Sequence, residues 1–225
     1  MTVVVAARPR EGARRSPASL VVGAATILTL VGIAIAVFFN PVWVSFEQGR
    51  TRADLWTGYT PAVVRTVTDS VLAEVYLGPG TFTQSVEGTT VFNDRERAHM
   101  ADVRRVVVAF FGLVLFAAAI LLVGGIRSRG AAWYWRAIAR GSAVLAVGTV
   151  VVGIAFALAF DQAFTLFHDV LFAPGTWSFD TATNRLVQLF PDAFWTETSV
   201  AIAVVGLLLT FATWAFARRR ARGQA

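Results

Sequence analysis

The stretch ASLVVGAATILTLVGIAIAVFF, residues 18–39, contains 22 amino acids in a row without a charged side chain. A helix needs ~20 mainly apolar residues to cross the ~30 Å hydrocarbon core of a bilayer. The stretch stops at Asn40-Pro41, a pair typical of a helix end. It exceeds the ~7–15 apolar residues of a cleaved signal peptide, and no A-x-A cleavage site follows before Trp43. We therefore expect residues 18–39 to form a retained transmembrane helix.

Three more runs of this kind follow, at residues 106–126, 142–160 and 198–217. Four such runs in 225 residues leave too little polar chain to cover them in a soluble core. The composition agrees, because 56% of the residues are hydrophobic against ~45–50% in a typical soluble domain. The sequence predicts an all-α membrane protein, a four-transmembrane-helix bundle forming a single membrane domain.

The arginines indicate how the bundle is oriented. The chain has 20 of them, no lysine, and a net charge of +6. Residues 1–17, 127–141 and 218–225 hold twelve arginines and one acid, whereas residues 40–105 and 161–197 hold eight arginines and thirteen acids. Positive charge accumulates on the cytoplasmic side of membrane proteins. We expect a multi-pass membrane protein with both termini in the cytoplasm. The basic segments are then topology signals and imply no nucleic-acid partner.

The extracytoplasmic segment 40–105 has local helix and turn signals. Thr60-Pro61 predicts a helix start, and valines at 64, 67, 71 and 75 share one face of that helix. Residues 81–92, rich in Thr, Val and Phe around Glu87-Gly88, predict a short β-hairpin. Asn93 then predicts the start of a helix that continues into the second span.

The extracytoplasmic segment 161–197 is unusually apolar for a loop and too interrupted for a fifth span. We expect interfacial helices that dip into the outer leaflet and complete a cap over the bundle. Such a surface suits contact with membrane lipid or a lipidated ligand. The alternative is that its aromatic side chains only anchor the spans.

The only two histidines, His99 and His168, fall at the same face and at a similar depth, so they can meet in a bundle. Asp102 lies three residues after His99 and shares its helix face, although neighbouring arginines compete for this carboxylate. Asp169 is adjacent to His168 and points elsewhere on a helix. The alternative is that each histidine merely caps a helix at the membrane boundary. Without cysteine, lysine or a G-x-S-x-G motif, the chain offers acid/base groups but no evident nucleophile.

Two blocks resemble the signatures of the Lit (lipoprotein intramolecular transacylase) family. Residues 96–104, ERAHMADVR, are similar to the family's E-x-x-H-M-x-D-V-[KR]. Residues 167–195 are similar to its second signature, F-H-x-x-L-F, then W-x-F, then L-F-P-x-x-F-W. The likeness extends from residue 18 to 217 and is weak through 41–92.

The resemblance implies an acyltransferase of the bacterial plasma membrane, without metal or cofactor and with its active site at the extracytoplasmic face. Lit-like enzymes move an ester-linked acyl chain from the diacylglyceryl group of a bacterial lipoprotein to the α-amine of its N-terminal Cys. The partners implied are diacylated lipoproteins and membrane lipid, and we expect a monomer. The resemblance implies His99 as base, oriented by Asp102, and His168 as the second partner, although these roles can be reversed. It gives supporting roles to Glu96, Arg97 and Asp169, and an acyl groove to Trp177, Phe190 and Trp195.

Two alternatives remain open from the sequence. A metal-dependent membrane hydrolase would use His99, His168, Asp102 and Asp169, although the spacing H-x-x-E-H or H-E-x-x-H is absent. A non-catalytic accessory protein would use the histidines only as helix caps.

Overall fold

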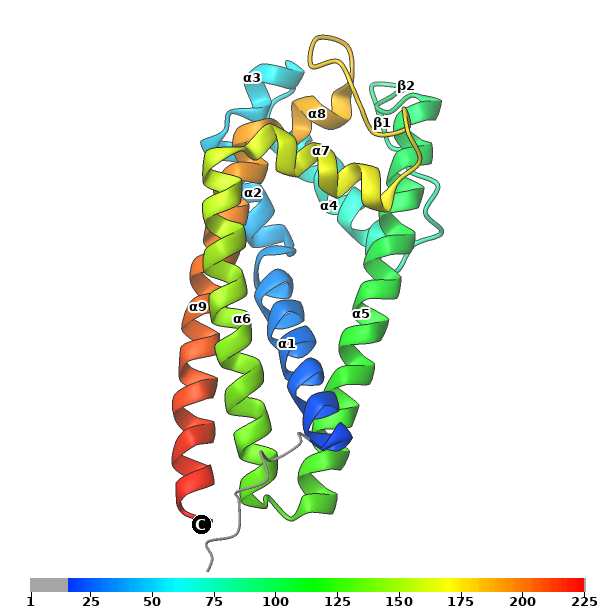
Figure 1. Ribbon diagram of the computed structural model, residues 1–225. Helices are drawn as coiled ribbons and strands as arrows, with labels where there is room; N and C mark the ends of the chain where they lie inside the picture. Colours follow the sequence, from blue (N-terminus) through cyan, green and yellow to red (C-terminus); the bar gives the residue numbers. More distant parts are fainter. Residues whose placement is uncertain (1–15, 225) are drawn as a thin grey trace, which may run out of the picture.

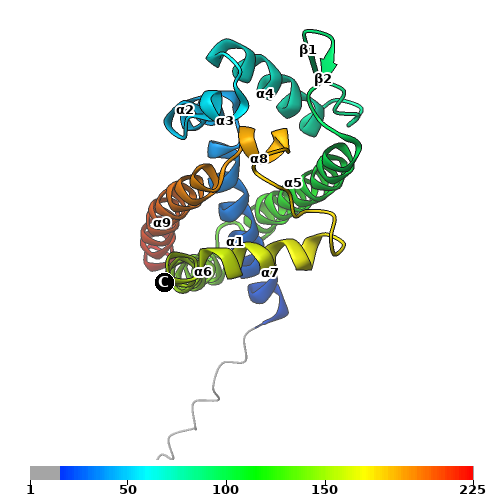
Figure 2. The ribbon, with the colours of Figure 1, turned by 90° about the horizontal axis from the view of Figure 1, so that it is seen from above.

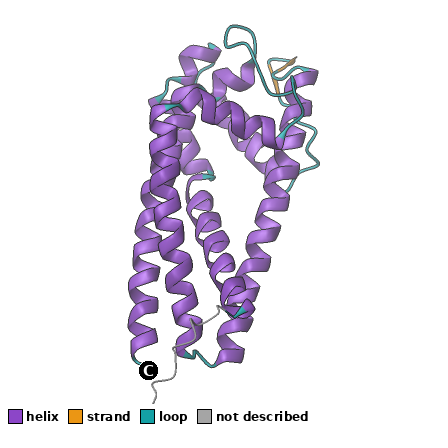
Figure 3. Cartoon of the chain, in the orientation of Figure 1, coloured by secondary structure: helices purple, strands orange, loops and turns teal. Residues whose placement is uncertain are grey.

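The computed structural model describes residues 16–224, and these form helices almost throughout (Figure 1). Four helices are long and apolar enough to cross a membrane. They are α1 (Pro17–Phe38), α5 (Asp94–Ser128), α6 (Ala132–Leu158) and α9 (Asp192–Arg222). Figure 3 shows how little of the chain is strand. The predicted all-α four-helix class is therefore confirmed. Most of the predicted basic N-terminus, residues 1–17, lies outside the described residues.

Three of the long helices begin well before the apolar runs that predicted them: α6 at the end near the C-terminus, where it begins at Ala132, and two at the opposite end. Helix α5 begins at Asp94 although its run begins at 106, and α9 begins at Asp192 although its run begins at 198. Both carry an acidic residue in the first turn, where the helix dipole favours negative charge. Both helices thus extend the bundle beyond its apolar part, and the extension of α5 carries His99.

Helix α1 packs between α5 and the pair formed by α6 and α9 (Figures 1 and 2). A Cβ atom at Gly141 of α6 would lie 2.5 Å from the carbonyl oxygen of Gly23 on α1. Gly32 of α1 is likewise in tight contact with Val114 of α5. Small residues allow this approach, and in lipid such van der Waals packing replaces the hydrophobic drive available in water.

The end of the bundle opposite the C-terminus carries a cap, made of residues 39–93 and 159–191 (Figure 1). The predicted helix start at Thr60 and the predicted hairpin around Glu87-Gly88 are both confirmed. Asn40 ends α1 as expected, but it also begins a new helix, because its side chain accepts two backbone hydrogen bonds. The cap elements are α2 (Pro41–Arg50), α3 (Ala53–Thr57), α4 (Pro61–Tyr76), β1 (Ser85–Val86), β2 (Thr89–Thr90), α7 (Phe160–Leu171) and α8 (Arg185–Leu189).

Helix α4 buries the predicted valine face in the core of the cap. All four valines, at positions 64, 67, 71 and 75, are buried. Met100 of α5 and Leu189 of α8 pack in the same cluster, together with Phe82 and Phe92. This core therefore joins three separate segments of the chain, and α8 lies in the middle of the cap when seen from above (Figure 2).

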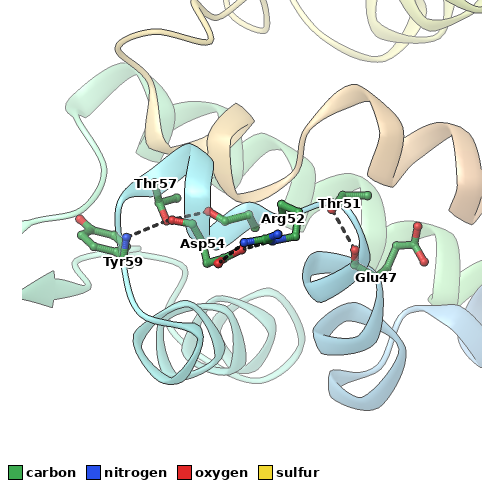
Figure 4. A network of polar contacts seen from close by, with 7 residues as sticks. Glu47, Thr51, Arg52, Asp54, Thr57 and Tyr59 are labelled. Atoms are coloured by element: carbon green, nitrogen blue, oxygen red, sulfur yellow. Dashed lines mark hydrogen bonds and ion pairs between the residues drawn. The ribbon is translucent and has the colours of Figure 1, made fainter.

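The turn between α2 and α4 is held by local polar contacts (Figure 4). Arg52 has the left-handed φ of 57° that reverses the chain, and its guanidinium pairs with Asp54 at 3.2 Å. The Thr51 hydroxyl donates to a backbone carbonyl of α2 at 2.8 Å. The Tyr59 amide donates to the Thr57 hydroxyl oxygen at 3.2 Å. The last of these bonds satisfies a backbone N–H just past the end of α3, and the other two hold the turn through side chains.

The second extracytoplasmic segment forms two different helices. Helix α7 crosses the bundle end from α6 toward α5 and exposes Leu166, Phe167 and Val170, as expected of an interfacial helix (Figure 1). Helix α8 differs from that expectation, because Gln188 and Leu189 are buried inside the cap. Hydrogen bonds hold it there. The Gln48 side-chain amide, for example, donates to the Leu189 carbonyl at 3.0 Å.

Candidate active site

The structure brings the two histidines together. His99 lies near the start of α5 and His168 near the end of α7, with ring centroids 6.2 Å apart and ring planes at 28°. Neither ring would reach the other if α5 began with its apolar run at 106 or if α6 continued straight past Leu158. The early start of α5 and the crossing of α7 are thus the features that build this pair.

Aromatic side chains enclose both rings. Phe172 and Phe179 meet His99 edge to face, with centroids at 4.8 and 5.5 Å. Phe164 and Trp177 lie against His168 at 4.0 and 4.9 Å. His99 is 6% exposed, whereas His168 is half-buried. The two imidazoles therefore occupy a largely apolar enclosure near the start of α5.

Burial keeps both histidines neutral near pH 7. It lowers the pKa of His99 to about 4, with a further lowering by the nearby His168 and an opposing effect of the Asp102 charge. Burial also lowers the pKa of His168, opposed by a hydrogen bond to the Phe164 backbone and by the Asp169 charge. The charged form of a buried imidazole is disfavoured because the enclosure solvates it poorly.

A hydrogen bond fixes the tautomer of His168. Its Nδ1 lies 2.8 Å from the Phe164 carbonyl oxygen, which can only accept. Nδ1 therefore carries the proton in the neutral ring, and Nε2 presents a lone pair. The Nδ1 atom of His99, by contrast, is buried without a hydrogen-bond partner among the described residues. Of the two rings, His168 is the one preset to accept a proton.

The carboxylate expected to orient His99 is engaged elsewhere. Asp102 forms an ion pair with Arg105, one turn along α5, and within residues 16–224 no hydrogen bond joins it to His99. Its influence on the histidine is through charge alone. Arg97 similarly pairs with Asp94 at the surface. Spacing by three residues allowed Asp102 to face either neighbour, and the arginine offers the stronger charge partner.

Glu96 has a structural position that explains its place in the signature. It is 2% exposed, and its carboxylate accepts backbone N–H bonds from Asn93 and from Leu186, each at 2.8 Å. The first completes a capping box that begins α5. The second joins α8 to α5 one turn before His99. Glu96 is thus a positioning residue for the histidine end of α5.

Sequence reasoning missed Arg95. Its guanidinium donates to the Ser178 carbonyl and stacks over the Phe179 ring, 4.9 Å from the ring centroid. It thereby holds the loop 173–184 beside His99. The role of Phe164 was also missed, although its spacing four residues before His168 on a helix was a usable signal.

The three predicted groove residues separate in space. Trp177 lies against His168, as described above. Phe190 and Trp195 instead pack with Phe194, beside Val44 of α2. A role in holding acyl chains therefore remains a prediction for all three. Among the described residues, no group of three His, Asp or Glu side chains could hold a metal ion.

Comparison with known proteins identifies relatives of this chain. The family model described as lipoprotein intramolecular transacylase Lit matches residues 20–195. An uncharacterized protein of Aquifex aeolicus is 30% identical over 122 residues, which are 54% of each chain, so the match spans about half of that relative's length.

Solved structures share the fold. The membrane-integral lipoprotein intramolecular transacylase Lit of Bacillus cereus is 18% identical, with a TM-score of 0.78, over 92% of this chain and 95% of that one. A variant of that protein with one histidine replaced by alanine has a TM-score of 0.73 over 92% and 93% of the two chains. Four long apolar helices and this likeness make the chain a bacterial membrane protein.

The position of Glu96 predicts a large loss of stability in Glu96→Ala. Two backbone N–H groups would lose a charged acceptor, and hydrogen bonds to charged groups contribute about 1.5–3 kcal/mol each. Glu96→Gln should fall between wild type and alanine, because it retains one acceptor oxygen. The measurement is thermal unfolding of the purified protein in detergent. Arg97→Ala, which removes only an exposed ion pair, is the control and should unfold near the wild-type temperature.

Proposed function

This chain belongs to the lipoprotein intramolecular transacylase Lit family, and from that premise we propose that it moves an acyl chain within a diacylated bacterial lipoprotein. The ester-linked chain passes from the diacylglyceryl group to the α-amine of the N-terminal Cys, without metal, in a monomeric enzyme. The observation that carries this proposal is the meeting of the only two histidines inside an aromatic enclosure.

The residues fit a reaction whose nucleophile comes from the substrate. The α-amine, with a pKa of ~8, must lose its ammonium proton before it attacks the ester carbonyl. The C–N bond then forms, the C–O bond to glycerol breaks, and one proton moves from nitrogen to the glycerol oxygen. Neutral imidazoles suit this proton transfer, and such acid/base roles typically contribute ~10²–10⁴-fold in rate.

The contacts favour His168 as the base, which reverses the assignment implied by the signature. Its Nε2 is free to accept the amine proton and to return it to the glycerol oxygen, because Nδ1 is committed to Phe164. His99, with a pKa near 4, is the weaker base. In this proposal its ring N–H supports the departing glycerol oxygen through a hydrogen bond. Asp102 acts on His99 through charge.

The enclosure favours the amine over water as the attacking group. Amine and ester belong to one molecule, and holding them together can replace a large part of the activation barrier. Phe164, Phe172, Phe179 and Trp177 surround the histidines and limit the access of water. An open two-histidine site would hydrolyse the ester instead, and the acyl chain would be lost.

Each histidine should be needed for the transfer. We expect His99→Ala and His168→Ala each to lower the rate ~10²–10⁴-fold, because each removes an acid/base partner. The assay is mass spectrometry of lipoprotein N-termini from a host lacking other N-acylation. The transfer does not change mass, so fragmentation must locate the acyl chain on nitrogen.

Three results would contradict the proposal. Wild-type cells that show only O-acylated fragments and a free α-amine would exclude transacylation. Full activity of both histidine variants would favour an accessory role. Loss of wild-type activity with a chelator, restored by added metal, would favour a metal-dependent hydrolase. Thr66→Ala, an exposed change on α4, serves as the expression control.

The pH profile should show one titration near neutrality. The free amine becomes more abundant as pH rises, so the rate should increase about tenfold per pH unit up to ~8. A base acts in its unprotonated form, and burial lowers the pKa of both histidines below the usual 6.5. Both histidines therefore remain able to act as bases as the pH falls to 6.5. The plot of log rate against pH becomes steeper only below pH 6.5. Initial rates with a diacylated lipopeptide between pH 5.5 and 9 test this, and a second break above pH 6.5 would disprove it.

The charge distribution supports an active site at the extracytoplasmic face. Arginines cluster in the last turn of α9 and around the turn between α5 and α6, at the end of the bundle opposite the histidines. We infer that this basic end is cytoplasmic, by the positive-inside preference. The histidines then lie where lipoprotein N-termini are displayed.

Single cysteines can test the orientation, because the chain has none of its own. Thr89→Cys, exposed on the hairpin, should react with a membrane-impermeant maleimide in intact cells. Gln224→Cys, exposed near the C-terminus, should react only after permeabilisation. The opposite labelling pattern would place the histidines in the cytoplasm and overturn the inferred orientation.

A further inference from the structure

Trp177 has a buried indole N–H without an acceptor among the described residues. Two half-buried tryptophans of the cap region have one: the indole of Trp43 donates to the Thr198 hydroxyl oxygen and that of Trp195 to the Phe190 carbonyl, both at 3.1 Å. A buried donor without an acceptor destabilises a fold, and native proteins rarely retain one without a reason. The unpaired N–H of Trp177 therefore requires an explanation that the fold itself does not supply.

The location of this donor points to the reaction. The Trp177 ring lies 4.9 Å from the His168 ring, tilted by 33°, and also borders Phe164. His168 Nε2 is the proton acceptor proposed above, and the buried Nδ1 of His99 also lacks a partner. Three polar atoms with unused hydrogen-bonding capacity thus belong to side chains of one aromatic enclosure.

The loop that carries Trp177 is fixed on both sides. Gly175 takes a φ of 80°, which turns the chain two residues earlier. Arg95 donates to the carbonyl of Ser178, the next residue, and stacks on Phe179. The backbone that carries the indole is therefore held by α5, the same helix that carries His99. A hydrogen-bond donor stabilises a transition state best when it is oriented in advance in this way.

We propose that Trp177 is a catalytic residue, whose indole N–H donates to the carbonyl oxygen of the substrate ester. When the amine forms the C–N bond, that oxygen takes up negative charge, and it returns the electron pair as the C–O bond to glycerol breaks. The indole keeps its proton throughout, because it only donates. This assignment rests on the proposed transacylation and gives it the oxyanion donor that the histidines do not provide.

An indole suits this task in an apolar enclosure. Arginine or lysine in this place would require burial of a charge, which is costly without a partner. The indole N–H is neutral in every state of the proposed proton transfer, so it does not compete with His168 for the proton. Its ring also adds to the aromatic wall that excludes water.

The test is Trp177→Phe, assayed with a diacylated lipopeptide in detergent. The change keeps an aromatic ring and removes the N–H. Loss of one oxyanion donor typically lowers kcat ~10²–10³-fold, and we expect KM and the unfolding temperature to stay near wild type. Trp43→Phe is the matched control, because it removes an indole N–H that bonds to Thr198 away from the histidines, and it should retain wild-type kcat.

The outcomes separate this inference from the proposed function. If the wild-type enzyme transacylates and Trp177→Phe keeps kcat within about threefold, Trp177 is not the donor, although the function stands. A rise in KM with unchanged kcat would likewise overturn the inference and make the ring a groove contact. If Trp177→Phe fails to fold, a tryptophan analogue with sulfur in place of the N–H is placed at position 177 instead. Its kcat and KM are then interpreted in the same way. An inactive wild-type enzyme would refute both proposals.

Discussion

The buried carboxylate of Glu96 is the interaction on which the candidate site depends. It accepts the backbone N–H of Asn93, which begins α5, and the backbone N–H of Leu186, which lies in the first turn of α8 in the cap. One carboxylate therefore determines where α5 starts and how α8 rests on it. His99 follows three residues later on the same helix. A carboxylate that is 2% exposed is tolerated because both contacts are short hydrogen bonds to donors without another partner.

The histidine pair illustrates how the same burial serves structure and chemistry. Withdrawal from water lowers the pKa of both rings and leaves them neutral, so that either can accept a proton at neutral pH. Charge on His168 also disfavours charge on His99, whose ring centroid lies 6.2 Å away. In the proposed mechanism the pair passes a single proton, which is the number that acyl transfer from oxygen to nitrogen requires.

The sequence predicts the parts of this fold that depend on periodicity. Long apolar runs predicted the four helices, and the valine spacing predicted the buried face of α4. The Asn93 signal predicted the start of α5. The contacts that side chains make on folding were harder to predict from the sequence. Asp102 could face His99 or Arg105 by the same spacing, and only packing decided for the arginine. Phe190 and Trp195 share a signature with Trp177, yet the turn into α9 carries them toward α2.

Helix α7 shows how the site can serve a substrate that is partly in lipid. One face of α7 carries Phe164 and His168, with Phe172 just past the helix end, and this face lies against the enclosure. Its other side exposes Leu166, Phe167 and Val170. In the bilayer, such a surface rests among acyl chains rather than in water. A lipoprotein is linked to two acyl chains that are costly to withdraw from the membrane, so its ester is most easily reached from a helix lying at the boundary. In the proposed reaction, the crossing of α7 brings His168 to the ester at that boundary without removing the substrate's acyl chains from lipid.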